Sequence, residues 1–148
     1  MRNFITELFS NKVLIAAAFA WFISQFIKVV TASVAGGKLD LTPFLSSGGM
    51  PSAHSATVTA AAVATGKYSG WDAPIFGLAV FFALIVMYDA AGVRRAAGKQ
   101  AVLLNQLVDH INNHRKEKTQ EKLKELLGHT PVEVVAGSII GIIAALVF

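Results

Sequence analysis

Residues 73–93, APIFGLAVFFALIVMYDAAGV, decide the fold, because this long apolar stretch contains a single charged residue, Asp89. A helix that crosses the hydrocarbon core of a bilayer needs about 20 mostly apolar residues. The 148-residue chain is 54% hydrophobic and 15% charged, whereas a soluble domain usually has about 25% charged residues. Length and composition therefore predict one membrane domain, residues 1–148.

Further apolar stretches elsewhere in the chain predict additional transmembrane helices. We expect an all-α, polytopic membrane helix bundle with four spans, at about residues 12–34, 51–67, 73–95 and 130–148. The second and fourth spans are short and rich in small residues, which is typical of helices that pack closely in lipid.

Residues 96–128 are polar enough to lie outside the bundle. Apolar residues recur in them at helical spacing, at Val102, Leu103, Leu107, Val108 and Ile111. This pattern predicts an amphipathic helix on the membrane surface. A solvated turn and a second, short helix ending at Gly128 should follow.

Four antiparallel spans would place both chain ends on the same side as the turn at residues 66–73. The glycine-rich loop at residues 35–50 and the segment at 96–128 would lie on the other side, with ten of the thirteen Lys and Arg residues. Because basic residues favour the cytoplasmic side, we expect this second face to be the cytoplasmic face of a plasma membrane protein.

A polar corner, GGMPSAHSATVTA at residues 48–60, precedes the second span on this basic side. Ser52 can cap the helix by accepting a backbone N–H, and a helix start with unpaired N–H groups also suits an anion. His54 is either a hydrogen-bonded bundle residue or a general acid that protonates a departing oxygen.

The start of the fourth span, GHTPVEVVAG at residues 128–137, has a capping-box pattern from Thr130 to Glu133, with Pro131 at the first helical position. That pattern leaves His129 unexplained. The Glu133 carboxylate could hold the His129 ring in the tautomer that exposes its other nitrogen for attack.

Other charged residues close the first and third spans on the same side. Lys28 could extend its amine to the membrane interface or contact a phosphate. Asp89 could form a structural ion pair with Arg94 or Arg95. We expect at least one of the two arginines to point inward, because a guanidinium matches phosphate oxygens.

These motifs together resemble a known family. PSAHS at residues 51–55 resembles the PSGH motif of the type 2 phosphatidic acid phosphatase superfamily, which includes vanadium haloperoxidases, and GHTPVEVVAG resembles the end of its third motif. With YDAAGVRRAAGKQA at residues 88–101, the chain is similar to the divergent branch of that superfamily, from about residue 12 onward.

The resemblance implies a catalytic set. His129 would be the nucleophile and form a phosphohistidine, Glu133 would orient it, and His54 would protonate the leaving alcohol. Lys28 corresponds to the lysine of the first motif, and Ser52 with nearby backbone N–H groups would help to hold the phosphate.

The chain departs from the superfamily pattern at several positions. Ala35 and Gly36 replace the Arg-Pro of the first motif, Leu123 replaces an arginine of the third, and Ala53 replaces a glycine. We expect Arg94 and Arg95 to supply the missing positive charge from the third span.

The predicted function is a phosphatase for a lipid phosphate monoester or a polyprenyl (di)phosphate, with no metal and no cofactor. Its partners would be membrane lipid and the lipid phosphate substrate, without nucleic acid, and its small-residue faces could support a homodimer. One alternative is a non-catalytic membrane protein that binds anionic lipid headgroups or supports an assembly. Another is a metal site built from Asp89, His54, His129 and Glu133, although their spacing matches no metal signature.

Overall fold

The computed structural model describes residues 3–45, 48–115, 123 and 128–148, and within these residues it contains helices and no strand. The helices are α1 (Phe4–Ser10), α2 (Lys12–Gly36), the 3₁₀ helix η1 (Thr42–Leu45), α3 (Ala53–Ser69), α4 (Pro74–Ala91), α5 (Val93–Arg115) and α6 (Pro131–Val147). The predicted all-α class is confirmed.

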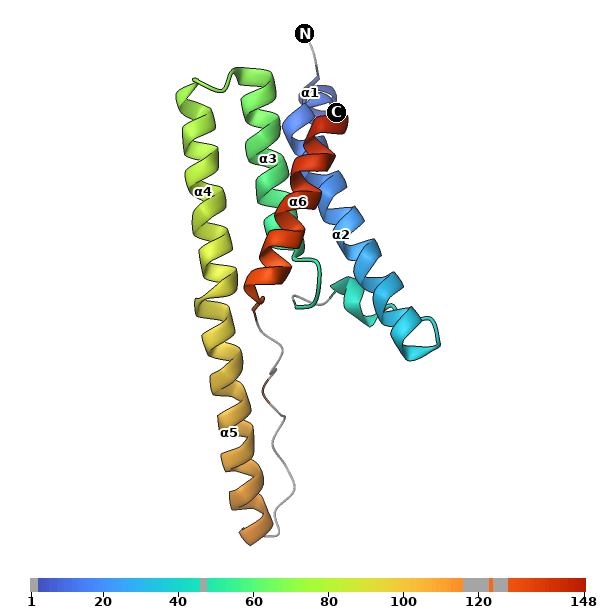
Figure 1. Ribbon diagram of the computed structural model, residues 1–148, viewed down its shortest axis with the longest axis vertical. Coiled ribbons are helices and arrows are strands. Elements are labelled where there is room, and N and C mark those ends of the chain that lie inside the picture. Colours follow the sequence, from blue (N-terminus) through green and yellow to red (C-terminus); the bar gives the residue numbers. More distant parts are fainter. Residues whose placement is uncertain (1–2, 46–47, 116–122, 124–127) are drawn as a thin grey trace.

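Two helical stretches in the described part of the chain are long and apolar enough to cross a membrane, namely α2 and the continuous Pro74–Ile111 formed by α4 and α5. Helix α6 is a shorter apolar helix. Helix α3 lies at the centre of the bundle, where it packs against α2, α4 and α6 (Figure 1). Both chain termini lie at the same end as the α3–α4 turn, as the sequence predicts.

Side-chain caps fix where the principal helices begin. Asn11 accepts hydrogen bonds from the backbone of Val13 and Leu14 at the start of α2. Ser52 accepts one from the Ser55 N–H at the start of α3. Thr130 and Glu133 form the predicted capping box at the start of α6. The predicted caps of α3 and α6 are therefore confirmed.

The core of the bundle consists of small side chains from α2, α3 and α6. It contains Ala16, Ala20, Ala56, Ala60, Ala64, Ala144 and Ala145. Many large apolar side chains face outward instead, among them Phe22, Phe26, Phe81 and Phe82. Small residues inside and large apolar residues outside form the pattern expected of helices that pack closely in a lipid environment.

The closest approach between helices joins α3 and α6. A Cβ atom at Gly137 would lie 2.2 Å from the Ser52 carbonyl oxygen, and one at Gly141 would lie 2.4 Å from that of Ala56. The two glycines are four residues apart and so lie on one face of α6. Only glycine at both positions lets the two backbones approach this closely.

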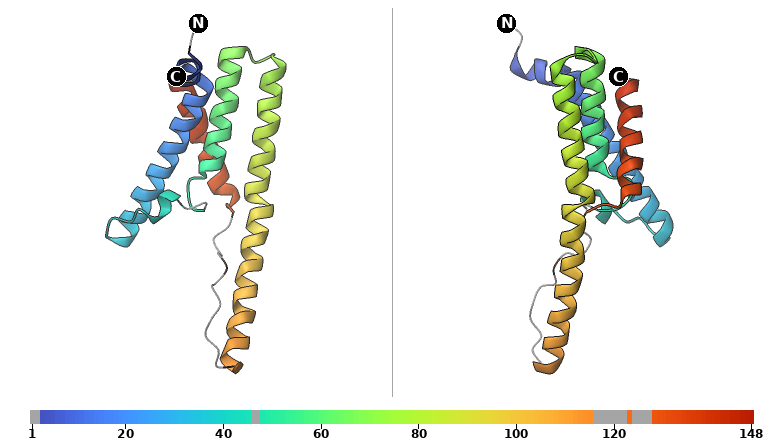
Figure 2. Two further views of the ribbon diagram at one scale, coloured as in Figure 1. Left: turned by 180° about the vertical axis from the view of Figure 1, so that it is seen from behind. Right: turned by 60° about the vertical axis from the view of Figure 1, so that its left-hand side comes forward.

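Helix α5 covers residues where the sequence predicts an amphipathic helix on the membrane surface, but it extends in an unexpected direction. It begins at Val93 and continues roughly along the axis of α4, beyond the end of the bundle (Figures 1 and 2). Gly92 does not break the helical ladder, because its N–H donates to Tyr88 O and its carbonyl accepts from Ala96 N. The short helix predicted before Gly128 falls mostly on residues 116–122 and 124–127, outside the described residues.

We predict that Gly137→Ala destabilises the protein by about 1–3 kcal/mol, because its methyl group would force the α3 and α6 backbones apart. The measurement is thermal unfolding of the purified protein in detergent. Gly77→Ala is the matched control, since a Cβ atom there would meet nothing within 4 Å. Equal melting temperatures for the Gly137 variant and the wild type would contradict the proposed close packing.

Candidate functional site

Two histidines from distant parts of the chain meet at the end of the bundle where α3 and α6 begin. His54 lies in the first turn of α3, and His129 lies in the connection just before α6. Their ring centroids are 5.7 Å apart and their planes are inclined by 60°. Both rings therefore belong to one site at one end of the molecule.

Three features fix the backbone around His129. Its N–H donates to the carbonyl oxygen of Ala90 at the end of α4, at 2.9 Å. The preceding residue, Gly128, has φ +88°, and a Cβ atom there would lie 2.3 Å from the Arg95 backbone nitrogen. The capping box of α6 follows immediately. His129 is thus held between the α4–α5 junction and α6.

Glu133 links the cap of α6 to the His129 ring. Its Oε2 accepts the Thr130 N–H at 3.1 Å and lies 3.1 Å from Nδ1 of His129. An ionised carboxylate can only accept hydrogen bonds, so Nδ1 carries the proton. The His129 Nε2 then keeps its lone pair, and this buried nitrogen has no partner among the described residues.

The environment of His129 favours the neutral ring. The side chain is 1% exposed, and this burial lowers the pKa of His129 below its ordinary value, while the contact with Glu133 acts in the opposite direction. The lowering effect of burial is the larger of the two. A neutral imidazole with a free nitrogen can act as a nucleophile.

The starts of α3 and α6 are hydrogen-bonded to each other. The Ser52 N–H donates to the Glu133 carbonyl oxygen at 3.0 Å. The Ser52 hydroxyl accepts from the backbone and the side chain of Ser55. Ser52 is fully buried, and its hydroxyl acts as the cap of α3. Its predicted contact with phosphate stays a prediction.

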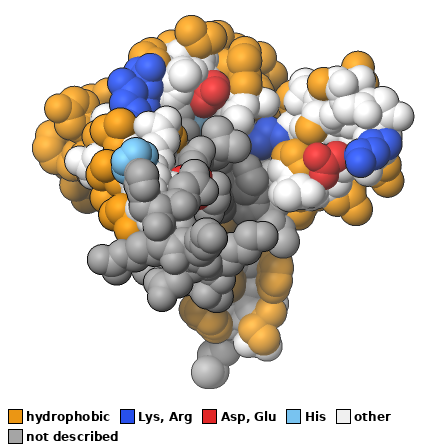
Figure 3. All heavy atoms as spheres, turned by 90° about the horizontal axis from the view of Figure 1, so that it is seen from below, with side chains coloured by type: hydrophobic (Ala, Val, Ile, Leu, Met, Phe, Trp, Pro, Cys, Tyr) orange, Lys and Arg blue, Asp and Glu red, His pale blue; other side chains and the backbone are white. Residues whose placement is uncertain are grey.

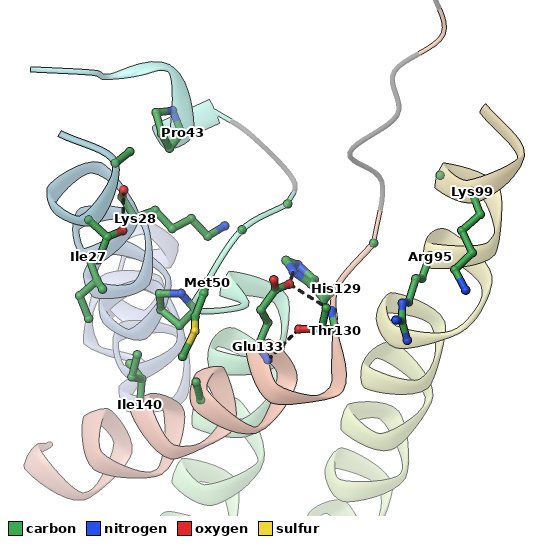
Figure 4. Close-up of a pocket in the computed structure, with 18 of the residues that line it drawn as sticks. Ile27, Lys28, Pro43, Met50, Arg95, Lys99, His129, Thr130, Glu133 and Ile140 are labelled. Carbon is green, nitrogen blue, oxygen red and sulfur yellow. Dashed lines mark hydrogen bonds and ion pairs between the residues drawn. The ribbon is translucent and has the colours of Figure 1, made fainter. Parts of the chain in front are cut away.

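A cavity of about 900 Å³ lies beside His129, between α2, the loop before α3, α5 and α6. Figure 4 shows Lys28 extending from α2 on one side, with Arg95 and Lys99 on α5 across from it and Glu133 with His129 between them. The rest of the lining is mostly apolar and includes Ile27, Met50, Val102, Ala136 and Ile140.

The structure separates the two arginines that the sequence could not distinguish. Arg94 Nε lies 2.7 Å from the Asp89 carboxylate, and both side chains are substantially exposed. Arg95 lines the cavity. Arg95 is thus the arginine that points inward, and Arg94 forms the ion pair considered for Asp89. Phosphate binding by either arginine stays a prediction.

Lys28 and Lys99 complete the cations of the cavity. Lys28 is 3% exposed, so it does not extend to the membrane interface as its alternative interpretation required. Lys99 was not among the residues predicted from the sequence. The available signal was its place four residues after Arg95, which puts both side chains on one face of α5.

His54 contacts His129 but lies outside the lining of the large cavity. It lines a second cavity of about 230 Å³ together with Lys28, which lines both. No sequence pattern predicted this second cavity. Its other polar residues, Gln25 and Thr57, lie inside predicted spans and carry no motif.

In the described part of the chain, no three His, Asp or Glu side chains gather as metal ligands would. Asp89, one of the four residues considered for a metal site, is hydrogen-bonded to Arg94 instead. Figure 3 views the molecule from the end that holds the site and shows charged side chains scattered among hydrophobic ones on the described part of this face.

The fold and this site define a class: a small helix bundle of membrane type with two adjoining histidines beside a basic cavity. The model of the Divergent PAP2 family matches residues 9–144, and the chain belongs to this family. The predicted resemblance is thereby confirmed.

A curated relative agrees with this assignment. The chain is 43% identical over 152 aligned positions to the uncharacterized membrane protein YuiD of Bacillus subtilis (strain 168), and the match covers 95% of this chain and 96% of the relative. No solved structure matches the chain.

We predict that Glu133→Gln lowers the pKa of His129 further, because the substitution removes a negative charge that favours the protonated ring. The measurement is an NMR titration of the His129 ring resonances in detergent micelles, with the wild-type protein as the reference. A His129 titration midpoint that is unchanged or higher would contradict the assigned contact.

Proposed function

We propose that this protein is a metal-independent phosphatase that hydrolyses a membrane lipid phosphate through a phosphohistidine. The observation that carries this proposal is the His129 ring, which Glu133 orients, with His54 beside it and a basic cavity in front of it. The substrate class is a lipid phosphate monoester or a polyprenyl (di)phosphate.

In the first step, His129 Nε2 attacks phosphorus in line with the bond to the lipid oxygen. The new N–P bond forms as that P–O bond breaks, and the lipid alkoxide takes a proton from the imidazolium form of His54, which becomes neutral. Glu133 accepts the Nδ1 hydrogen bond throughout and stabilises the positive charge that develops on the His129 ring.

In the second step, water attacks the phosphohistidine. The P–N bond breaks as the new P–O bond forms, and His54 accepts a proton from the water molecule. His54 thus acts first as an acid and then as a base, and both histidines return to their starting states.

Fixed cations supply the charge that phosphoryl transfer requires. The transferred group carries negative charge on its equatorial oxygens, and catalysis depends mainly on placing and stabilising that charge. Lys28, Arg95 and Lys99 line the cavity on both sides of His129. Arginine and lysine side chains can fill this role in a water-poor site, so the proposed mechanism needs no metal ion or cofactor.

Substrate binding has to rearrange the site, because His129 Nε2 is enclosed before the reaction. The edge-to-face contact between the two rings leaves no room for a phosphoryl group in line between them. Catalytic contacts commonly form only in the substrate complex. We therefore include in the mechanism a side-chain movement that separates His54 from His129.

The apolar part of the large cavity would hold the lipid. Its lining continues from Glu133 to Ala136 and Ile140, one face of α6 over about two helical turns. A headgroup phosphate at the cations would place the attached chain along this apolar surface. The same geometry leaves the hydrolysed alcohol in the bilayer.

The same proposal includes four membrane crossings, by α2, α3, α4 and α6. We place the protein in the plasma membrane with the histidine site on the cytoplasmic side. The support is the number of Lys and Arg residues in the connections at that end.

A second candidate function is non-catalytic binding of anionic lipid headgroups or support of an assembly. The observation that favours it is the absence of the superfamily arginines at Ala35 and Leu123, together with the use of the Ser52 hydroxyl as a helix cap. A basic cavity with an apolar wall would also serve such binding.

We predict that the purified full-length protein releases phosphate from phosphatidate, phosphatidylglycerol phosphate or a polyprenyl (di)phosphate in EDTA, and that vanadate inhibits it. His129→Ala should reduce turnover to background, and His54→Ala should reduce it by about 10²–10⁴-fold. The control is His110→Ala on α5.

Full activity of His129→Ala would refute the nucleophile assignment. Tight binding of these lipids by the wild type without turnover of any of them would support the non-catalytic alternative.

We predict that Ala136→Phe raises KM for a long-chain lipid phosphate by about tenfold or more, because the ring would occupy the apolar part of the large cavity and displace the chain. Val135→Phe is the control. Val135 is the residue next to Ala136, but its side chain is 58% exposed and does not line the cavity. The measurement is steady-state kinetics, and equal KM values for the two variants would place the lipid elsewhere.

A further inference from the structure

The smaller cavity adjoins the histidine pair at His54. Its lining comes from α2, α3 and α4 and consists of Trp21, Gln25, Lys28, Ala53, His54, Thr57, Val58 and Val86. His129 lines the larger cavity, His54 lines the smaller, and Lys28 lines both. The site therefore has two chambers, and each is lined by one of the two contacting histidines.

Gln25 gives the smaller cavity a fixed hydrogen-bond acceptor. Its side chain is 4% exposed, and its Nε2 donates to the Phe44 carbonyl oxygen at 2.5 Å. A carbonyl can only accept, so this bond determines which end of the amide is nitrogen. The other end, Oε1, has no partner among the residues that the structure describes.

His54 brings a second unsatisfied polar atom to the same cavity. Its Nδ1 is buried and has no hydrogen-bond partner in the described part of the chain. Buried polar atoms without partners are rare, and ordered water commonly satisfies them. A cavity of about 230 Å³ far exceeds the roughly 10–15 Å³ that one water molecule requires.

We propose that the smaller cavity binds the water molecule that hydrolyses the phosphohistidine, and that Gln25 is the residue that positions this water. This inference rests on the proposed function. The two chambers then separate the reactants: the lipid enters and its alcohol leaves through the larger cavity, and water arrives from the smaller one.

The chemistry of the second step matches this arrangement. The water oxygen forms a bond to phosphorus as the P–Nε2 bond of His129 breaks. One water proton passes to a ring nitrogen of His54, and the other O–H donates to Gln25 Oε1. Because His54 protonates the leaving oxygen in the first step, water that attacks from its side approaches opposite to Nε2, as in-line displacement requires.

The alternative occupant of the smaller cavity is a lipid chain, since Trp21, Val58 and Val86 form an apolar part of its wall. The two occupants have opposite kinetic consequences. A group that positions water affects only the hydrolysis of the phosphoenzyme, whereas a group that contacts the lipid affects the formation of the phosphoenzyme.

The test is Gln25→Leu in the full-length protein, assayed with a ³²P-labelled lipid phosphate that the wild type hydrolyses. We expect kcat to fall by at least about tenfold and KM to fall by the same factor, so that kcat/KM is unchanged. The acid-quenched, labelled phosphoenzyme should accumulate at steady state. A lower kcat/KM without accumulated phosphoenzyme would show instead that Gln25 acts before the phosphoenzyme forms.

Ser24→Ala is the matched control. The Ser24 hydroxyl is also buried and without a partner within the described residues, and it neighbours Gln25 on α2, but it does not line the cavity. This variant should match the wild type in kcat, in KM and in the amount of phosphoenzyme at steady state.

Val86→Phe tests the cavity without removing a polar group. The phenyl ring should exclude water from the smaller cavity, so hydrolysis should again be slow and the phosphoenzyme should accumulate. This variant keeps the test decisive if Gln25→Leu does not fold. Wild-type hydrolysis rates in whichever of these two variants fold would overturn this inference alone, and a reduced kcat/KM would assign the cavity to the lipid. If the wild-type protein shows neither turnover nor a phosphoenzyme, both the proposed function and this inference are overturned.

Discussion

The contact between the start of α3 and the start of α6 is the constraint on which the site depends. The Ser52 N–H donates to the Glu133 carbonyl, and Gly137 lies so close to the Ser52 carbonyl that no side chain fits between them. His54 follows Ser52 by two residues, and His129 precedes Glu133 by four. The close packing of the two helix starts therefore sets the distance between the backbones that carry the two rings.

Glu133 connects helix formation to the chemistry of the site. The same carboxylate oxygen accepts the Thr130 N–H, which the capping box requires, and contacts the His129 ring. The cap holds the carboxylate over the start of α6, so the histidine gains an oriented partner without a separate loop to position it. One carboxylate thus serves both the helix cap and the histidine. In a small bundle this limits the number of buried polar groups, each of which would need its own hydrogen-bond partner.

The charges of the site are arranged around the histidines in a similar way. Asp89 holds Arg94 at the exposed edge, and Arg95, the next residue on the same helix, lines the larger cavity with Lys28 and Lys99. Cations in the cavity and apolar residues along α6 fit an amphiphilic anion. The smaller cavity shares Lys28 with the larger one and adds Gln25 and His54, so the structure offers two approaches to one pair of rings.

The sequence by itself determined the features that depend on near neighbours in the chain: the apolar stretches, the caps at Ser52 and Thr130, and the motifs around His54 and His129 that identify the family. The tertiary structure decided which of two adjacent arginines lines the cavity, that Lys99 joins it, that His54 faces a separate chamber with Gln25, and that α5 continues the direction of α4. The physical reason is that local hydrogen bonds and side-chain periodicity define each helix, whereas the orientation of a side chain between helices depends on how closely the backbones pack. In this protein the distance between the α3 and α6 backbones is set by glycines on α6 and backbone carbonyls on α3. A local sequence pattern cannot predict which residues of two helices will meet in this way.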